Sequence, residues 1–396
     1  RAVLRAQLCG CQAGDGEVDV DAVEQRPGDF LAVTCDLVGG VAAGAFGVAV
    51  VAAGAGVHGG DELEARGEVA FHRGAADGDV AVFQRFAQHF EELTRVKFEK
   101  HPLYPNPVCW KCLARELKDE PQSLTILNTR RDALALIREL QRQKVSDLYH
   151  LSTLMCGAHR KDVLAAINAK LDNKDKPAVR LVSTQVVEAG VDLDFPVVYR
   201  ALAPLDRIIQ AAGRCNRNGN GPEKGRVVIF QTTSGKAPKG PYQKGIEKAH
   251  TILETVKDVD KELNGTDILC LYFTRLYTDV NPDELRVQPL RQDLEYRKVA
   301  ETYRLIREDT VSIIVPYGDY LPALEQWEHF PSRRSWRELQ PYVVSIYTHE
   351  VRNLKNAVRE LQEGVYLFEA VDKYDQLTGL PIDSDPADLI YLTGGR

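Results

Sequence analysis

The sequence predicts an α/β protein built on a parallel sheet with helices on both faces. Short apolar runs alternate with segments of helical periodicity from residue 91 onward. The crossovers that this alternation implies give a parallel sheet covered on both faces. Polar clusters follow several of the runs directly. With 396 residues, of which 44% are hydrophobic and 27% charged, the chain has room for two or three globular domains, and its composition argues against long disorder.

The predicted strands and helices alternate in the order of a doubly wound sheet. The strands cover residues 123–128, 148–153, 179–184, 195–202 and 226–231. The helices cover residues 130–143, 159–171 and 205–217, and apolar residues of the first share one face at Leu134, Ile137 and Leu140. Because such crossovers make the strands parallel, ligands gather at the carboxyl ends of the strands. The polar clusters fall at these ends, in residues 128–130, 152–153, 183–184 and 190–194.

The first ninety residues differ from the rest of the chain. They hold 6 of the 50 basic and 13 of the 57 acidic residues, which leaves 44 of each sign beyond them and places the whole net charge of −7 in this segment. Ala, Gly and Val dominate it, and Lys, Ser, Ile and Asn are absent, unlike ordinary globular usage. We expect residues 1–90 to be an antisense or misjoined translation. Two alternatives stay open, a transmembrane helix at Leu37–Val57 and a genuine Ala/Gly-rich domain.

The most informative stretch is 183–219. Ser183-Thr184 ends a predicted strand, where hydroxyls and freed amides can hold a phosphate, and Gly190 lets backbone approach a ligand closely. Asp192 and Asp194 precede the next strand, where a carboxylate can accept from a ribose hydroxyl. A further group falls on one face of the predicted helix at spacings of three and four: Gln210, Gly213, Arg214 and Arg217. Each feature alone is typical of a helix cap, a solvated loop or a solvated helix face. Together they predict a triphosphate site, because one guanidinium can bind two phosphate oxygens at once.

This stretch resembles motifs V and VI of a superfamily 2 helicase. Within that group, EAGVDLDFP and ALAPLDRIIQAAGRCNRNG resemble the type I CRISPR-associated helicase-nuclease family. LNTRRDALAL at 127–136 resembles motif IV, and LSTLMCGAHRKDVL at 151–164 resembles the DNA-contacting motif that follows it. LQPYVVSI at 339–346 and YDQLTGL at 374–380 are similar to the accessory C-terminal domain of the family. The resemblance covers about residues 95–396 and is strongest over 123–231.

The resemblance implies a second RecA-like helicase lobe at 91–238, with motifs IV to VI, and a linker with a smaller, mostly helical α+β accessory domain at 239–396. It implies that Arg214 and Arg217 reach the phosphates of ATP and that Gln210 orders the γ-phosphate or its attacking water. Gly190, Asp192 and Gly213 would form the rest of the nucleotide site. Contacts to the backbone of single-stranded DNA are implied at Thr129, Arg130, Ser152, Thr153, Arg160 and Thr184. His159 is open between a DNA contact and a helix-start residue.

Several motifs of a complete motor do not occur in the sequence. There is no G-x-x-x-x-G-K-[ST] phosphate loop, no Asp-Glu-x-His or Asp-Glu-x-Asp run, and no His-Asp dipeptide. ATP and Mg²⁺ would therefore need a first RecA-like lobe, and we expect no ATPase, unwinding or nuclease activity from this polypeptide alone. The expected partners are single-stranded DNA, the CRISPR surveillance complex, and the missing first lobe and nuclease domain. We expect no resident metal and no membrane association.

Other functions and segments stay open at this point. The alternatives are a non-catalytic DNA-binding or effector-docking module that works in trans, and a generic superfamily 2 helicase. Cysteine usage without a recognisable leader predicts a reducing, cytoplasmic setting. The Cys109-x-x-Cys112 pair is interpreted as packed or free thiols, with a redox or metal role as the alternative. In the accessory domain we expect helices at 246–263 and 282–307, and one antiparallel strand pair in 342–349 and 364–371.

Overall fold

The computed structural model of the chain describes residues 94–219, 223–238, 240–265, 267–279, 281, 283–303, 310–354 and 357–382. The anomalous segment 1–90 and the apolar run Leu37–Val57 lie outside the described residues. Among the described residues, no helix is both long and apolar enough to cross a bilayer. The chain divides into a larger unit, Arg95–Asp260 with Leu271–Arg396, and a smaller one that includes Lys261–Cys270. The predicted domain boundaries at 91–238 and 239–396 stay a prediction.

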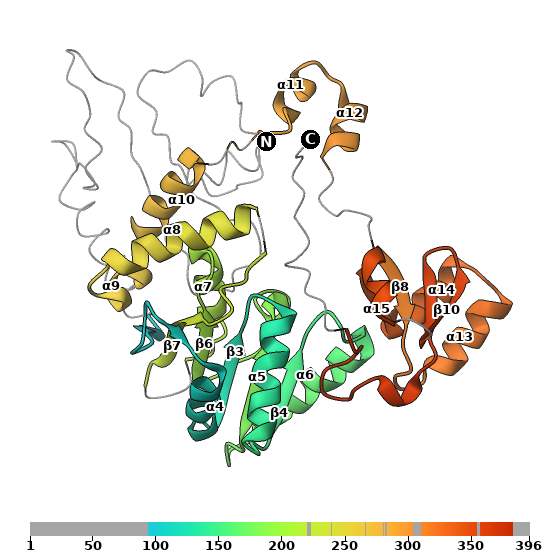
Figure 1. Cartoon of the computed structure of the whole chain (residues 1–396), viewed down its shortest axis with the longest axis horizontal. Coiled ribbons are helices and arrows are strands. Elements are labelled where there is room, and N and C mark those ends of the chain that lie inside the picture. Colours follow the sequence, from blue (N-terminus) through green and yellow to red (C-terminus); the bar gives the residue numbers. More distant parts are fainter. Residues whose placement is uncertain are drawn as a thin grey trace, which may run out of the picture. The chain divides into compact units, whose positions relative to one another are not determined.

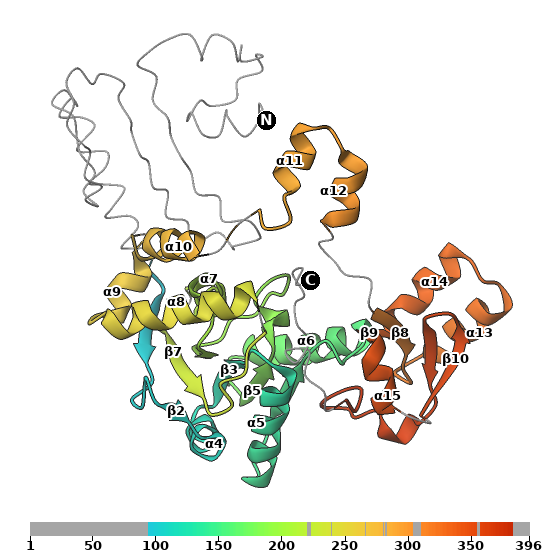
Figure 2. The same ribbon diagram turned by 45° about the horizontal axis from the view of Figure 1, so that its top comes forward.

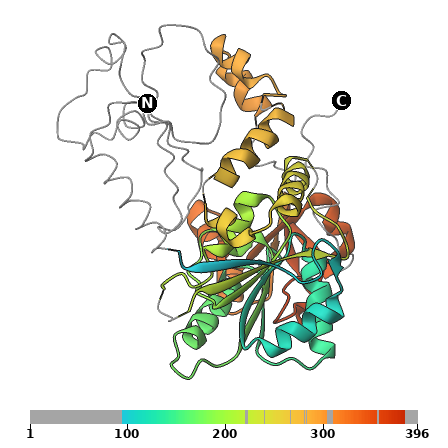
Figure 3. The same cartoon turned by 90° about the vertical axis from the view of Figure 1, so that its left-hand side faces the viewer.

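The larger unit contains the predicted parallel sheet. Its strands are β1 (Val96–Lys100), β2 (Pro107–Val108), β3 (Gln122–Ile126), β4 (Leu148–Leu151), β5 (Val179–Ser183), β6 (Val197–Ala201) and β7 (Gly225–Thr232). The order across the sheet is β1-β7-β6-β3-β5-β4, with β2 paired to the end of β7, and every pairing is parallel. Figure 1 labels β3, β4, β6 and β7, and Figure 3 shows helices on both sides of the sheet. The α/β prediction is confirmed.

The central strands of the sheet are buried along their whole length. Every residue of β3, β5 and β6 is buried. On one face the sheet packs against α4 (Trp110–Asp119) and α5 (Arg130–Arg142), which contribute Leu113, Leu117, Leu136, Ile137 and Leu140 to a single core cluster. Two further helices, α6 (Gly157–Leu171) and α7 (Leu205–Ala212), contact β4 to β6. The strands are thus covered on both sides, which removes the need for an alternating pattern.

The helix predicted to continue to Arg217 ends earlier. Gly213 follows the last residue of α7, and the chain then returns to the sheet. The Phe195 amide donates to the Arg214 carbonyl at 2.9 Å, and the Asn216 amide donates to the Phe195 carbonyl at 2.9 Å. This bridge between Phe195 and Cys215 requires extended backbone, so the helix cannot continue through the segment. Arg214 and Arg217 therefore lie in an irregular segment, and the prediction that they share a helical face with Gln210 is wrong.

The C-terminal part contains a second, mixed sheet of strands β8 (Thr310–Ile314), β9 (Val343–Tyr347), β10 (Val358–Gln362) and β11 (Val365–Phe368) in the order β10-β11-β8-β9. The two predicted strands are present, but they do not pair with each other. Strand β8 lies between them, antiparallel to β9 and parallel to β11. The predicted antiparallel pair is wrong because sequence patterns do not report which distant segment fills the central position. Helices α13 (Tyr320–His329) and α14 (Arg333–Leu339) pack on this sheet through Trp327 and Leu339.

The remaining helices are shorter than predicted. The segment 246–263 contains parts of two helices, α8 (Pro241–Thr255) and α9 (Val259–Asn264), because Val256 is extended. Helix α10 (Asp267–Asp279) follows. In place of one helix at 282–307, the described residues form α11 (Val287–Gln292) and α12 (Tyr296–Thr302), separated at Leu294, whose φ is 58°. Figure 2 shows α8 and α10 to α12.

Candidate nucleic-acid interface

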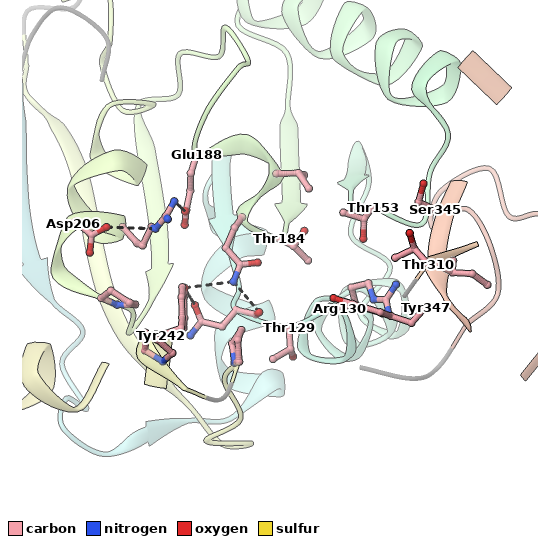
Figure 4. A pocket seen from close by; sticks show the side chains of 18 of the residues that line it. Thr129, Arg130, Thr153, Thr184, Glu188, Asp206, Tyr242, Thr310, Ser345 and Tyr347 are labelled. Atoms are coloured by element: carbon pink, nitrogen blue, oxygen red, sulfur yellow. Dashed lines mark hydrogen bonds and ion pairs between the residues drawn. The ribbon is translucent and has the colours of Figure 1, made fainter. Parts of the chain in front are cut away.

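A cavity of about 840 Å³ lies at the carboxyl ends of the central strands. Its polar lining includes Thr129, Thr153, Thr184, Gln185, Glu188 and Tyr242. The second sheet contributes Thr310, Ser345 and Tyr347, and Glu350 comes from the 3-10 helix Thr348–Glu350 that follows β9. In Figure 4, Thr153 lies near Ser345 and Thr310, while Glu188, Asp206 and Tyr242 lie at the opposite end. The cavity is where a doubly wound sheet is expected to bind a ligand.

Three predicted DNA-contacting threonines meet at this cavity. Thr129 is the N-cap of α5, and its hydroxyl oxygen accepts from the Asp132 amide at 3.1 Å. Because a hydroxyl has one donor and two acceptor positions, this cap leaves its O–H able to donate to a phosphate. Thr184 precedes the short 3-10 helix Gln185–Val187, and Thr153 is exposed. The three hydroxyls thus come from the ends of three adjacent strands, β3, β4 and β5.

Arg130 lines the same cavity but is engaged within the protein. It is 5% exposed, and its guanidinium forms a buried ion pair with Glu350, which is itself fully buried. A carboxylate oxygen of Glu350 also accepts from the Tyr347 amide at 3.0 Å. Removing one member of such a pair leaves a buried charge without compensation. Arg130 therefore connects the first turn of α5 to the second sheet.

Three other residues predicted near DNA do not line the cavity. Ser152 is fully buried, and its hydroxyl oxygen accepts from the Leu154 amide at 3.3 Å. Arg160 lies in the first turn of α6 and is partly exposed. His159 is buried and contacts the Tyr374 hydroxyl through Nδ1 at 2.9 Å and the Gln376 carbonyl through Nε2 at 3.0 Å. His159 lies in the first turn of α6, which agrees with its interpretation as a helix-start residue. Its ring contacts the C-terminal segment at Tyr374 and Gln376.

The predicted nucleotide-binding residues lie outside the cavity lining. Arg214 is 4% exposed, and its guanidinium donates to the carbonyls of Val187, Val191 and Glu188 at 3.0, 2.7 and 2.9 Å. Burial, together with the nearby Arg217, lowers the pKa of Arg214. All three nitrogen atoms of the guanidinium are therefore used to fix the loop that carries Gly190.

Arg217 has a different environment. Its Nε lies 3.2 Å from a carboxylate oxygen of Asp192, and 29% of the Arg217 side chain is exposed compared with 83% for Asp192. Both carboxylate oxygens of Asp194 accept from backbone amides, at 2.7 Å from Arg217 and 3.1 Å from Asn218. Arg217 is thus the more accessible of the two predicted arginines, and its guanidinium is paired with the exposed carboxylate of Asp192.

The other residues of the predicted nucleotide site are Gln210, Gly190 and Gly213. The Gln210 side-chain oxygen accepts from Arg207 at 3.1 Å. Gly190 has a φ of 75°, and an added Cβ would meet nothing within 4 Å, so its backbone is open to a ligand. Gly213 follows the last turn of α7. Within the described ranges, no group of three or more His, Cys, Asp or Glu residues is arranged to hold a metal ion.

A buried ionic network, missed by the sequence analysis, connects the cavity with the arginine segment. Arg200 on β6 is fully buried and contacts Glu188 at 2.8 Å, the Asn128 side-chain oxygen at 2.9 Å and the Tyr242 hydroxyl at 3.1 Å. Burial raises the pKa of Glu188, and Arg200 opposes this shift. Since the Glu188 carbonyl accepts from Arg214, the network extends from Asn128 to Arg214. The sequence feature that could have indicated this network is Arg200, the single charged residue in the run VVYRAL.

The strand order and the polar strand ends define a parallel α/β domain with a cavity at the carboxyl ends of its strands. Residues 119–220 match the sequence model of the family described as CRISPR-associated nuclease/helicase Cas3, C-terminal. This region of the chain therefore belongs to the CRISPR-associated nuclease/helicase Cas3 family.

Individual relatives match parts of the chain. A CRISPR-associated nuclease/helicase Cas3 of Haloferax volcanii is 31% identical over 176 residues, which are 39% of this chain and 19% of the relative. A CRISPR-associated endonuclease/helicase Cas3 of Thermus thermophilus is 48% identical over 42 residues, 11% of this chain and 5% of the relative. The crystal structure of T. fusca Cas3 covers 69% of this chain and 38% of its own, with 17% identity and a TM-score of 0.46. The chain thus spans less than a quarter of the length of the curated relatives it matches.

Proposed function

We propose that this chain is part of an ATP-dependent DNA helicase-nuclease of type I CRISPR antiviral defence. In this function the second lobe binds single-stranded DNA in the cavity and presents Arg217 to ATP held by a first RecA-like lobe. The observation that carries the proposal is the meeting of Thr129, Thr153 and Thr184 at the carboxyl ends of adjacent strands. The nuclease domain and the CRISPR surveillance complex are the further partners that the family assignment suggests.

The cavity suits a phosphate backbone better than a specific base. Hydroxyls of Thr129, Thr153 and Thr184 can donate to phosphate oxygens, and α5 directs its first amides toward the same end of the sheet. Such contacts do not read sequence, so we expect binding that weakens as salt rises and depends little on base composition.

The nucleotide would be contacted from this lobe by Arg217, Gln210 and the open backbone at Gly190. When bound, ATP supplies a phosphoryl group whose transfer to water releases free energy. Arg217 can reach a phosphate only if it leaves Asp192, which a multiply charged phosphate favours because it offers a stronger acceptor than one exposed carboxylate. Arg214 holds the 187–191 loop in place. We expect no ATP hydrolysis by this chain without a first lobe.

The DNA proposal is tested by fluorescence anisotropy of the full chain with a labelled oligothymidylate. Thr153→Glu places a negative charge beside the proposed backbone path and is expected to weaken binding about tenfold, or about 1.4 kcal/mol. Thr251→Glu makes the same change on the exposed surface of α8 and should leave affinity nearly unchanged. Equal affinities of the two variants at low salt would contradict the assignment of the cavity.

Adding ATP with a first RecA-like lobe from a relative separates a motor from a docking module. A motor is expected to change its affinity for single-stranded DNA when ATP binds, and Arg217→Ala should remove that change. A docking module would bind DNA with the same affinity in both conditions. The generic helicase alternative is disfavoured by the family match over 119–220.

A further inference from the structure

The CWKC segment forms a disulfide at the start of α4, contrary to the interpretation of Cys109 and Cys112 as thiols. Cys109 is the extended N-cap residue, with φ −71° and ψ 146°, and Cys112 lies in the first helical turn. This geometry places their Cα atoms 5.2 Å apart, within the usual range for a disulfide. Both residues are half-buried, so a small thiol reagent can reach the pair.

The disulfide adds little constraint to the fold. The two cysteines are only three positions apart, and a cross-link stabilises a protein less when the loop that it closes is shorter. The same turn is already held without the disulfide. The Leu113 amide donates to the Cys109 carbonyl at 3.0 Å, and Val108 pairs with Thr232 of β7. Val108 and Leu113 are fully buried in the core cluster beneath the turn. A structural role therefore does not account for the bond.

The surroundings of Cys109 favour its reduced, anionic form. The Cys112 amide is directed at the Cys109 Sγ at 3.1 Å. The ten-residue helix α4 adds the positive end of its dipole at the same point, and Lys111 is exposed in the first turn. Each of these features stabilises a thiolate, which is the reactive form of cysteine in exchange reactions.

We propose that Cys109 and Cys112 form a thiol–disulfide exchange site whose reaction partner is a dithiol. A thiolate of the dithiol attacks one sulfur of the disulfide, forms a mixed disulfide and releases the other cysteine as a thiolate. The second thiol of the partner then attacks the mixed disulfide and releases the second cysteine. Two electrons and two protons pass to the chain, and the partner leaves as a cyclic disulfide. In the reverse direction, Cys109 is the attacking thiolate.

The test is thiol mapping of the folded full chain in mixtures of reduced and oxidised dithiothreitol. After acid quenching, alkylation and proteolysis, mass spectrometry should find the pair passing reversibly between no label and two labels as the mixture becomes reducing. Circular dichroism recorded in parallel should stay native. In the reduced chain at neutral pH, iodoacetamide is expected to modify Cys109 about tenfold faster than Cys112. Cys215 is the internal control, because it is 1% exposed and burial raises its pKa to about 12.

Two matched lysine variants test whether the charge beside Cys109 sets its alkylation rate. Lys111→Gln removes the cation in the first turn and should slow alkylation of Cys109 about two- to threefold. Lys118→Gln makes the same change in the last turn of α4 and should leave the rate unchanged. A pair that stays oxidised in excess dithiothreitol while the chain is folded would overturn the proposal, as would one that never oxidises. Faster alkylation of Cys112 than of Cys109 would also overturn it.

Discussion

Arg200 illustrates how much a single buried side chain determines in this lobe. The guanidinium has no exposed surface, and its main counter-charge is Glu188, which is 2% exposed. Glu188→Gln leaves the guanidinium buried beside a neutral amide, so we expect unfolding free energy to fall by about 3–5 kcal/mol. Urea denaturation of the full chain measures this loss. Glu301→Gln removes one member of an exposed pair with Arg297 and should cost less than about 1 kcal/mol, and equal losses in the two variants would contradict this account.

His150 makes stability depend on pH. It is 1% exposed and its Nδ1 lies 2.8 Å from the Val182 carbonyl. Burial lowers the pKa of His150 to about 4, compared with an ordinary 6.5 in the unfolded chain. Its contribution is therefore complete above pH 6.5 and is lost as pH falls from 6.5 toward 4, by on the order of 3 kcal/mol in total.

The variant His150→Asn tests this dependence, because an amide can still donate to the Val182 carbonyl but does not titrate. Between pH 7 and pH 5 its unfolding free energy should fall less steeply than that of the native chain. His329→Asn changes an exposed residue at the end of α13 and serves as the control. Parallel pH profiles for His150→Asn and the native chain would exclude the buried imidazole as the cause.

At the scale of elements, α5 combines a structural and a binding role in its first residue. Thr129→Ala removes the cap and should cost about 1 kcal/mol of unfolding free energy, and it also removes a proposed phosphate donor. Thr129→Ser retains both functions and is expected to behave like the native chain in urea denaturation and in DNA anisotropy. A serine variant as impaired as the alanine variant would contradict the role of the hydroxyl.

Elements were predictable from sequence where the determining forces are local or follow a simple period. Strands β3, β5 and β7 were predictable because each contains a short group of apolar residues between polar ones, which is visible in the residues themselves. The end of α7 was missed because it depends on the bridge between Phe195 and Cys215, which joins segments separated in sequence. The central strand β8 was missed for the same reason, since its two partners lie on β9 and β11.

Candidate site residues were only partly predictable. Thr129, Thr153 and Thr184 meet at the cavity because strand ends of a parallel sheet share one edge, a property that follows from topology alone. Arg130 and Arg214 could not be distinguished from free cations in the sequence. Their actual partners, Glu350 and the carbonyls of the 187–191 loop, are set by tertiary packing.

At the scale of the larger unit, specific contacts join the parallel-sheet part to the C-terminal part of the chain. Arg130 pairs with Glu350, and His159 bonds the Tyr374 hydroxyl. The Leu380 amide donates to the Leu154 carbonyl at 2.9 Å, next to Gly379, where an added Cβ would lie 2.4 Å from that carbonyl oxygen. The second sheet therefore forms a wall of the cavity rather than an independent appendage.

The central claim, that single-stranded DNA occupies the cavity at the strand ends, is tested most directly by hydrogen–deuterium exchange of the full chain with and without an oligothymidylate. We predict slower amide exchange in the segments 129–132, 152–155 and 184–188, each of which contributes residues to the cavity lining, and unchanged exchange in α13 and α14. Protection confined to α13 and α14, or no protection at saturating oligonucleotide, would contradict the claim.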